Sequence, residues 1–372
     1  MRWTLLLLAI AGAGCRPSAP PPPEPERGTL DPELARAFVP GNDLELVENG
    51  SVFDALERDI QRARSSVNIV TYIWRGDGEP SERIGRALLA RRSGVACRIV
   101  IDPFGSLKFS RSLEARLRDS GCDIRRYLRT GALLAHNHRK IQIVDGRWGI
   151  TGGFGIWKSW LGEGRTKEEW RDTAVRVTGP AVTQMQRAFE QSWRECQGPP
   201  LPASDYPGLE RAGPSRAAFF ASSPAPGKPT VAEVMTHALV AAARRRLWIA
   251  NSYFIPDKPL QQLLIRQARA GVDVRVIAPG PVHDVPPVRA AQRATYAGLL
   301  EAGVRIFEYQ PSMMHAKTMV VDDRYLVIGS TNFDQMSFDL LEEGSLVADA
   351  PHLARKLRGN LEPSEYSPSF RL

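Results

Sequence analysis

Cysteine is scarce in this sequence, with only four residues among 372. None of the four stands near histidines at the spacing of a metal site, so we expect no metal centre. Cys97 lies in the apolar segment GVACRIVID, and Cys122 lies in GCDIRRY. Because apolar surroundings are typical of small core residues, we expect Cys97 and Cys122 to be packed in the core rather than joined by a disulfide.

The sequence also lacks a hydrophobic run long enough to span a bilayer. The run LLLLAIAGAG, between Arg2 and Cys15, is too short to form a mature membrane helix. It resembles the signal of bacterial lipoproteins, in which the first mature residue is a lipidated cysteine, although Gly12 stands where leucine is common. We therefore expect residues 1–15 to form a signal peptide with lipidation at Cys15. Ordinary secretion and an uncleaved anchor are the alternatives.

The segment 16–38 contains PSAPPPPEPE, a proline-rich stretch that is typical of a semi-rigid linker. Such a linker would hold the folded part of the chain away from a membrane surface. We therefore expect a membrane-anchored lipoprotein of the bacterial cell envelope, on its periplasmic or outer face.

The net charge restricts the partners only in part. The formal charge of +8 is spread along the chain rather than gathered in a tail, which suits a phospholipid headgroup or a nucleic acid. No long basic stripe is interleaved with aromatic residues, and this absence disfavours nucleic acid.

With 43% apolar and 24% charged residues, the chain has an ordinary globular composition and the length for two domains or a duplicated one.

The two halves of the chain repeat one another. GVACRIVID from Gly94 matches GVDVRVIAP from Gly271, which is 177 residues later (271 minus 94). In each half the pattern predicts helix, strand, helix, strand, short strand and then a hairpin. This alternation predicts an α/β fold with two mixed, mainly parallel sheets and flanking helices. We place the halves at 39–197 and 215–372, joined by the Pro- and Gly-rich linker 198–214.

One polar pattern recurs at the same place in both halves. HRKIQIVDGRWGITGGFG begins at His138 and HAKTMVVDDRYLVIGSTN begins at His315. Both fit HxK, four residues, Asp, six residues and then Gly-Gly or Gly-Ser. Residues two apart on a strand point to one face, so each histidine should project together with its lysine, Lys140 or Lys317.

The rest of each segment predicts a hairpin. Asp145 and Asp322 are turn formers at the place where the chain should reverse. On the returning strand of the second half, Ser330 and Asn332 are two apart and should face the same way. His136 shares a strand face with His138 if that strand begins early.

These segments resemble the signature of the phospholipase D superfamily, and the likeness extends from about Gly41 to Ala350. The stretches NSYFIPDKPL, MMHAKTMVVDD and WRDTAVRVTGPAV look like those of bacterial cardiolipin synthases, which transfer a phosphatidyl group to a hydroxyl. The resemblance implies a duplicated phospholipase D-like fold with a pseudo-twofold axis and no cofactor. The chain would then be a monomer that forms an intramolecular pseudo-dimer.

Packing the two sheets face to face would bring both histidines to one phosphate. Two lysines beside a phosphodiester offset the negative charge that repels a nucleophile. One neutral imidazole can then attack phosphorus to give a phosphohistidine, while the other, protonated, donates to the leaving alcohol. By resemblance we take His138 as the nucleophile and His315 as the acid. The near symmetry of the halves leaves the reverse assignment open.

A histidine in this role needs an acceptor for its second ring nitrogen, and the resemblance supplies a carboxylate further along each half. The matching positions are Asp172 in EEWRDTAV and Glu343 in LLEEGSLV, with Glu342 as the rival of Glu343. The resemblance also counts Asp145 and Asp322 among the catalytic residues, although their position favours a turn-stabilising role.

The first half departs from the family pattern at Gly155, where asparagine is expected, and Gly153 lacks the hydroxyl of Ser330. We expect weaker activity or a differently oriented phosphate, because the histidines and lysines remain. Gly153, Trp157 and Met314 are the candidate substrate-binding residues. Trp157 and Met314 could line an acyl groove or could be ordinary core residues.

The leading hypothesis is a phosphatidyltransferase of the cardiolipin synthase type that acts on phospholipids. The alternatives are a phospholipase D that uses water, a secreted nuclease of the same superfamily and a non-enzymatic binding module. A lipid anchor would place the protein at a membrane, and this favours a lipid over a polymer. The headgroup, the acceptor alcohol and the balance of transfer and hydrolysis stay open.

Overall fold

The structure is a computed structural model that describes residues 30–128 and 136–361. The predicted signal peptide 1–15, with Cys15, lies outside these residues, as does most of the predicted linker 16–38. Among the described residues, no helix has both the length and the apolar character needed to cross a membrane.

The described chain begins with the short helix α2 (Pro32–Arg36), which the Asp31 side chain caps by accepting two backbone hydrogen bonds. The first half then alternates strands and helices. Its elements are β1 (Val39–Glu48), α3 (Ser51–Arg62), β2 (Ser66–Thr71), α4 (Glu79–Leu89), β3 (Ala96–Ile101), α5 (Arg111–Asp119), β4 (Cys122–Arg126), β5 (His136–Asn137), β6 (Ile141–Val144), β7 (Trp148–Gly152), η1 (Lys158–Trp160), β8 (Trp170–Arg171), β9 (Thr173–Thr178) and α6 (Ala181–Glu195).

The second half repeats this order after the one-turn helix η2 (Ala203–Asp205). Its elements are β10 (Ser215–Ser222), α7 (Val231–Ala242), β11 (Arg246–Asn251), α8 (Lys258–Arg269), β12 (Asp273–Pro279), α9 (Pro286–Ala294), α10 (Tyr296–Glu301), β13 (Arg305–Tyr309), β14 (Met313–Met314), β15 (Lys317–Val321), β16 (Tyr325–Gly329), α11 (Gln335–Asp339), β17 (Leu341–Asp349) and α12 (Pro351–Asn360). Both series fall inside the predicted halves, whose boundaries at 39–197 and 215–372 stay a prediction.

Local sequence explains where several helices begin. The side chains of Ser110, Thr230, Asp257 and Asp334 each accept a hydrogen bond from a backbone N–H in the first turn of the following helix. Proline occupies the first turn of α4, α8, α9 and α12, where its missing N–H has no intrahelical partner to lose. β2 is buried along its whole length, as expected for a strand that is covered on both faces.

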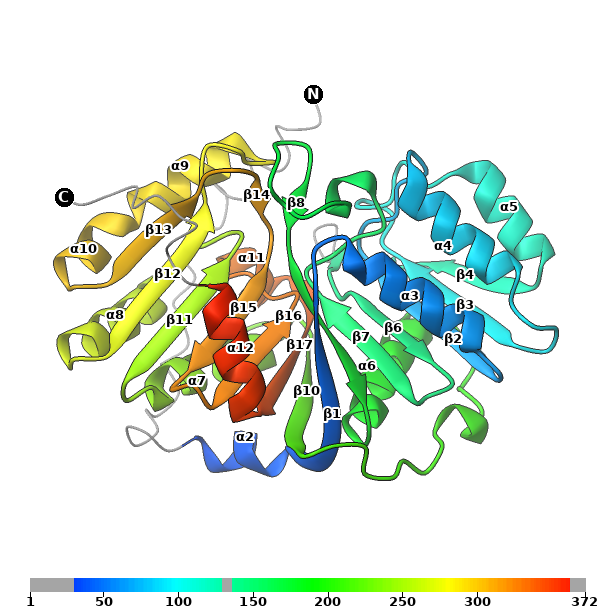
Figure 1. The fold of residues 1–372 in the computed structure, drawn as a ribbon, viewed down its shortest axis with the longest axis horizontal. Coiled ribbons are helices and arrows are strands. Elements are labelled where there is room, and N and C mark those ends of the chain that lie inside the picture. The colour runs from blue at the N-terminus through cyan, green and yellow to red at the C-terminus, as the bar shows by residue number, and fades with distance from the viewer. Residues whose placement is uncertain (1–29, 129–135, 362–372) are drawn as a thin grey trace.

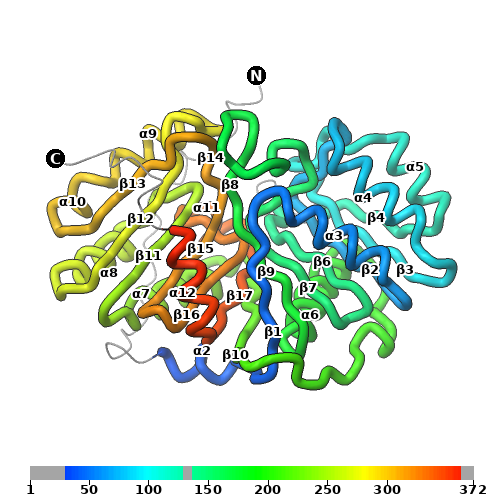
Figure 2. The backbone as a smooth tube through the Cα atoms, viewed as in Figure 1, coloured from blue at the N-terminus to red at the C-terminus, as the bar shows by residue number. Residues whose placement is uncertain are grey.

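The strands of the two halves join in one large mixed sheet. Outward from the centre, the second half runs β10-β17-β16-β15-β11-β12-β13 and the first half runs β1-β9-β7-β6-β2-β3-β4. The two orders therefore mirror each other about the antiparallel pair of β1 and β10. Figure 1 shows the halves side by side with these two strands between them, and the tube in Figure 2 follows the same course. The duplicated α/β fold is confirmed.

Parallel pairing is less common than we expected. Among the named strands of the described residues, and apart from the two-residue strands β5, β8 and β14, parallel pairing is confined to β2-β3-β4 and β11-β12-β13. The remaining pairs of named strands are antiparallel. Two of them are the hairpins of the HxK segments, in which the chain reverses so that the two strands run in opposite directions.

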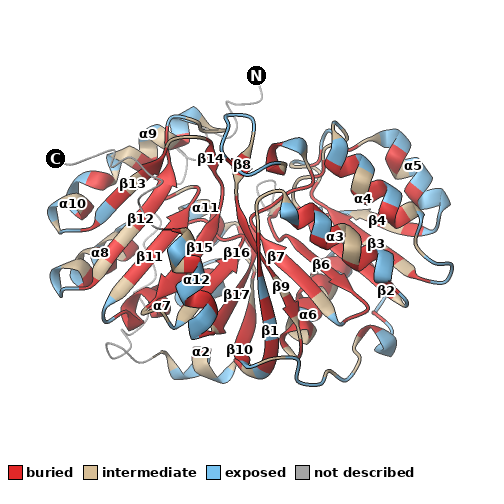
Figure 3. Ribbon diagram, in the orientation of Figure 1, coloured by how far each residue is buried: buried red, intermediate tan, exposed pale blue. Residues whose placement is uncertain are grey.

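A hydrophobic cluster packs the two halves together. It includes Val70, Ile141 and Val175 from the first half with Val320 and Leu346 from the second, and each is at most 1% exposed. Two further clusters lie mainly in one half each, although Met313 joins the cluster of the first half and Phe38 joins that of the second. Figure 3 shows buried strands in the middle and helices whose outer faces are exposed. The inner faces of the sheets therefore pack together, in addition to the join along β1 and β10.

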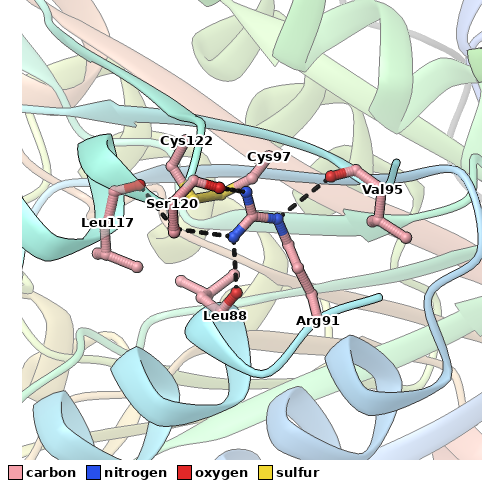
Figure 4. The surroundings of a disulfide bond; sticks show 7 residues. All are labelled: Leu88, Arg91, Val95, Cys97, Leu117, Ser120 and Cys122. Atoms are coloured by element: carbon pink, nitrogen blue, oxygen red, sulfur yellow. Dashed lines mark hydrogen bonds between the residues drawn. A yellow bond between two sulfur atoms is a disulfide. The ribbon is translucent and has the colours of Figure 1, made fainter. Parts of the chain in front are cut away.

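Cys97 and Cys122 form a disulfide, which corrects the expectation of two unpaired core residues (Figure 4). The parallel register of β3 and β4 sets the two cysteines directly opposite each other. Spacing along the chain does not reveal such a register, because it depends on which strands become neighbours. Cys196 is a free, partly buried thiol.

Arg91 packs beside this disulfide and ties the surrounding loops together. Its guanidinium donates to the carbonyl oxygens of Leu88 and Val95 at 2.8 and 3.2 Å, and to Ser120 (Figure 4). The disulfide therefore lies in a part of the first half that these hydrogen bonds also hold together.

Candidate active site

Both HxK segments lead directly into a hairpin strand. β6 begins just after Lys140, and β15 begins with Lys317. The side chains of both histidines and both lysines are buried, with His138 at 7%, Lys140 at 1%, His315 at 5% and Lys317 at 3% exposure. Four titratable groups are therefore removed from bulk water. In the buried site their charges act more strongly on one another than they would in water.

Each HxK segment is bonded to the opposite half through a short parallel strand pair. β5 precedes His138 and pairs with the start of β17, while β14 precedes His315 and pairs with β8. The His138 N–H also donates to the Glu342 carbonyl at 2.9 Å, and the His315 N–H donates to the Arg171 carbonyl at 2.7 Å. The backbone thus sets each histidine beside the next residue of the other half, which is a carboxylate in both cases.

Each histidine ring contacts that carboxylate from the opposite half. His138 Nδ1 lies 2.9 Å from Glu343 Oε1, and His315 Nδ1 lies 3.0 Å from Asp172 Oδ2. We expected one carboxylate in each half, and the structure adds that the pairs are crossed. With Nδ1–H donating to the carboxylate, Nε2 keeps its lone pair, as an attack on phosphorus requires.

Burial keeps both imidazoles neutral in the absence of an anion. Burial lowers the pKa of His138 to about 4, although the Glu343 carboxylate acts in the opposite direction. Burial, followed by the charge of Lys317, lowers the pKa of His315 well below its ordinary value. Lys317 also lowers the pKa of His138, so charges from the two halves act on a common site.

The lysines are held close to their histidines. Lys140 Nζ donates to the His138 carbonyl at 2.6 Å, and Lys317 Nζ lies 2.8 Å from His315 Nδ1 and 3.1 Å from Nε2. Burial lowers the pKa of Lys317 to about 8 and lowers that of Lys140 well below its ordinary value. The carboxylates of Glu343 and Asp172 raise the pKa of both lysines, whereas Lys317 lowers that of Lys140. An anion bound between the two ammonium groups would therefore stabilise their charged forms.

The two carboxylates differ in their surroundings. Glu343 also accepts a hydrogen bond from the Ser330 hydroxyl, and the neighbouring His138 helps to lower its pKa against the effect of burial. Burial raises the pKa of Asp172 to about 6, while Lys317 and a hydrogen bond from the Trp160 indole lower it. The crossed pairs are therefore alike in geometry and unequal in electrostatics.

Glu342, the rival of Glu343, has another partner. Its carboxylate lies 2.7 Å from the Arg139 guanidinium, and both side chains are fully buried. Arg139 is the middle residue of the first HxK segment, and it also donates to the carbonyl of Ala188. This ion pair joins the two halves behind the histidines, and sequence reasoning missed it because the middle position of HxK carries no fixed residue type.

Asp145 and Asp322 lie at the far ends of their hairpins and do not join the histidines. Asp145 accepts backbone hydrogen bonds from residues 64–66, and Asp322 accepts them from residues 244–246, at 2.7 to 3.0 Å. Both adopt a positive φ, of 54° and 53°. Their geometry is that of turn residues that hold the loop before β2 or β11, and it supports the turn-stabilising role rather than a catalytic one.

The structure explains why glycine replaces two polar residues in the first half. A Cβ at Gly153 would lie 2.6 Å from Asp172 Oδ1, and a Cβ at Gly155 would lie 2.9 Å from Ile73 and 3.0 Å from the Trp160 ring. The space that the family pattern gives to polar side chains is filled here by Asp172 and Trp160. In the second half Asn332 stays buried and accepts a hydrogen bond from the Ser252 hydroxyl at 2.8 Å.

The residues beside His315 form an aromatic wall. The sequence singled out Trp157 and Met314 as substrate-binding candidates, but not Trp170 or the ring contacts with His315. The Trp170 ring stacks on the His315 ring at 4.9 Å, and the Trp160 ring meets it edge-on at 5.2 Å. Trp157 packs against both tryptophans and carries Arg75 over its face, while Met314 is fully buried next to His315. The cluster of tryptophans in IWKSWLGEGRTKEEW was the available signal.

On the other side of the site, Tyr72 contacts His138 ring to ring at 4.9 Å. His136 lies next to Tyr72, and its Nδ1 is 3.3 Å from Asp102. Phe104 contacts the His136 ring at 5.0 Å and is 47% exposed. This chain of contacts connects the buried histidine with the protein surface.

The family described as "Cardiolipin synthase, PLD-like domain" matches residues 56–193 and 237–363, one segment in each half. The chain belongs to this phospholipase D-like family. Each matched segment contains one HxK hairpin.

Curated relatives are similar over most of this chain. A "Cardiolipin synthase" of Geobacillus kaustophilus is 32% identical over 79% of the chain and 60% of its own length. A "Cardiolipin synthase A" of Pseudomonas putida is 35% identical over 85% of the chain and 67% of its own length. The chain therefore spans about 60% of the length of the first of these phospholipase D-like relatives.

Two solved structures have the same fold. The phosphatidylserine synthase of Haemophilus influenzae superposes with a TM-score of 0.68 at 14% identity, covering 89% of this chain and 88% of that one. The polyphosphate kinase of Porphyromonas gingivalis gives a TM-score of 0.57 at 16% identity, covering 86% of this chain and 46% of that one. At these identities the likeness concerns the phospholipase D-like fold alone.

Proposed function

We propose that this protein is a phosphatidyltransferase that acts on phospholipids through a phosphohistidine intermediate, in the manner of a cardiolipin synthase. One observation carries the proposal: two buried histidines, each hydrogen-bonded to a carboxylate of the opposite half, lie close enough to both lysines for the charges of Lys140 and Lys317 to lower the pKa of each histidine. The similarity to curated cardiolipin synthases supports the choice of a phospholipid as the substrate.

The first step uses the two histidines in different roles. His138 Nε2 forms a bond to phosphorus as the bond from phosphorus to the leaving alcohol breaks, and His315 gives that alcohol a proton. The bound phosphate raises the pKa of His315 through its negative charge and so supplies the protonated imidazole. Lys140 and Lys317 stabilise the charge on the phosphoryl oxygens in the transition state.

In the second step an acceptor alcohol attacks the phosphohistidine. His315, now neutral, takes the proton of that alcohol, the new oxygen–phosphorus bond forms, and the bond from phosphorus to His138 breaks. Glu343 is the ionised partner that keeps Nδ1 of His138 protonated throughout. Water in place of the alcohol gives hydrolysis by the same steps.

Surface features near the site favour a lipid over a nucleic acid. Phe104, Leu107 and Leu128, which we call the apolar rim, are 47%, 63% and 71% exposed. They follow the neighbouring parallel strands β3 and β4 and so lie at the same edge of the sheet, where Phe104 contacts His136. Exposed apolar side chains beside a polar site suit the boundary between headgroups and acyl chains.

We place the enzyme at a membrane of the bacterial cell envelope, anchored by lipid on Cys15. The apolar run before Cys15 and the proline-rich segment after it support this location. The disulfide between Cys97 and Cys122 agrees with it, because disulfides persist in oxidising compartments.

A direct assay tests the proposed function. The purified protein is incubated with phosphatidylglycerol vesicles and, separately, with single-stranded DNA, and the products are analysed by mass spectrometry. We expect cardiolipin and glycerol from the vesicles, with phosphatidic acid where water replaces the acceptor, and intact DNA. Cleaved DNA together with untouched lipid would contradict the proposal.

A further inference from the structure

The two carboxylates that hold the histidines each accept a further hydrogen bond from a side chain, and the donors differ between the halves. On Glu343 the donor is the hydroxyl of Ser330, which occupies the place after Gly329 in the family pattern. On Asp172 the corresponding position is Gly153, which has no hydroxyl. A polar hydrogen atom must therefore come from another part of the first half.

That hydrogen atom comes from Trp160. Its indole Nε1 donates to Asp172 Oδ2 at 2.8 Å, and the same oxygen lies 3.0 Å from His315 Nδ1. The Thr173 N–H donates to the other carboxylate oxygen at 2.8 Å, so both oxygens are engaged. Trp160 is 0% exposed and belongs to η1, which holds it in place beside the site.

The glycines of the first half fit this substitution of donors. A Cβ at Gly153 would lie 2.6 and 2.7 Å from the two carboxylate oxygens of Asp172, so a serine there would displace the carboxylate. A Cβ at Gly155 would meet the Trp160 ring at 3.0 Å. Gly153 therefore makes room for the Asp172 carboxylate and Gly155 makes room for the indole. The indole does in the first half what the Ser330 hydroxyl does in the second.

We propose that Trp160 is a positioning residue, whose indole N–H holds the Asp172 carboxylate in place against His315 so that this histidine can act as acid and base. This inference rests on the proposed function, because it assigns Trp160 a part in the same reaction. The indole does not contact the phosphate; it acts through Asp172.

The test removes the N–H and keeps the shape of the side chain. Benzothienylalanine, which has sulfur in place of the indole N–H, is introduced at position 160 by suppression of a stop codon, and Trp160→Phe is prepared beside it. Trp193→Phe is the matched control, because Trp193 is also buried and donates its indole N–H, to the Pro199 carbonyl at 2.9 Å, away from the histidines. Turnover of phosphatidylglycerol is measured from pH 5 to 9.

We expect about a tenfold fall in kcat with KM little changed, as is common for a lost hydrogen bond to a charged group. The sign of the pH effect follows from the hydrogen bond, which lowers the pKa of Asp172. Without it the carboxyl binds its proton more tightly, so the acidic limb of the rate profile moves to higher pH. Trp193→Phe should leave kcat and the profile unchanged, and Ser330→Ala should lower kcat through Glu343.

Two results would overturn the inference. One is normal kcat with an unmoved profile in the benzothienylalanine protein, and the other is an equal loss at every pH, which would mean a packing role. If the unmodified protein turns over neither phosphatidylglycerol nor other phosphodiesters, it is the proposed function that fails. A normal benzothienylalanine protein beside an active unmodified one rejects only the role of Trp160.

Discussion

At the scale of residues, His138 and His315 occupy similar positions with unequal neighbours. His138 faces Glu343, whose pKa is lowered, whereas His315 faces Asp172, whose pKa is raised to about 6, and has Lys317 against its ring. An ionised carboxylate strengthens the imidazole as a nucleophile. This asymmetry supports His138 as the attacking group.

A substrate with a good leaving group tests that assignment. A p-nitrophenyl phosphodiester needs no proton from an acid when its first bond breaks. We expect His315→Ala to release about one p-nitrophenol per protein in a rapid burst and then stall, because the base for the second step is missing. His138→Ala should give no burst. The measurement is stopped-flow absorbance, and a burst from His138→Ala alone would reverse the roles.

Asp145 and Asp322 lead to a prediction about stability rather than chemistry. Asp145 is 6% exposed and accepts bonds from three successive backbone N–H groups, whereas the bonds of Asp322 are more exposed. Asp145→Ala should lower the free energy of unfolding by roughly 3 kcal/mol, and Asp322→Ala by less. Urea unfolding measures both. Folded variants should keep kcat within about threefold, and a complete loss of turnover in a stable Asp145→Ala protein would argue against the structural role.

The sequence was informative about the residues that repeat and uninformative about those that do not. His138 and His315, with their lysines, were predictable because the same spacing occurs twice. The side-chain donor to Asp172 was not predictable, because Trp160 replaces a hydroxyl that the pattern places seven residues earlier, at Gly153. Crossing of the histidine–carboxylate pairs also escaped prediction, since it depends on contacts between halves.

At the scale of elements, the disulfide follows from the pairing of β3 with β4. It closes a segment with a sequence separation of 25. A bond across a segment of this length stabilises the folded state by about 3 kcal/mol in the chain-entropy description. The alternation of strands and helices predicted both strands, whereas their register, and with it the bond, required the structure.

We therefore expect a reducing agent to lower the urea midpoint of the protein. Cys196→Ser should respond in the same way, because Cys196 is unpaired. The double variant Cys97→Ala/Cys122→Ala should start at the lower midpoint and not respond to the reductant. An identical midpoint with and without reductant in the unmodified protein would contradict the bond.

The apolar rim belongs to the loops after β3 and β4, and its expected role is contact with the bilayer. The double variant Phe104→Ser/Leu107→Ser should lower turnover of vesicles by about tenfold and leave turnover of a short-chain phospholipid monomer unchanged. The matched control is Val231→Ser/Val234→Ser, since these residues are 45% and 37% exposed on α7. Vesicle co-sedimentation measures binding, and equal losses on both substrates would argue against a membrane contact.

At the scale of the whole molecule, neither half contains a complete histidine–carboxylate pair. His138 requires Glu343, and His315 requires Asp172. The same halves are joined by β1 and β10, by the hydrophobic cluster between them and by the buried pair of Arg139 and Glu342. Activity should therefore depend on the contact between the halves and not on the peptide that links them.

Cutting the linker tests this dependence. Gly208 lies in the linker 198–214, it is exposed, and a Cβ built on it would meet nothing within 4 Å, so a protease recognition sequence can be inserted after it. After cleavage we expect one gel-filtration peak at the elution volume of the uncut protein. The kcat of the cleaved protein should lie within about twofold of that of the uncut protein. The uncut insertion variant is the control. The physical reason is that the buried contacts contribute more free energy to the association of the halves than the linker does. A linker only raises the effective concentration of one half near the other. Two separate peaks, each without activity, would show instead that the linker holds the site together.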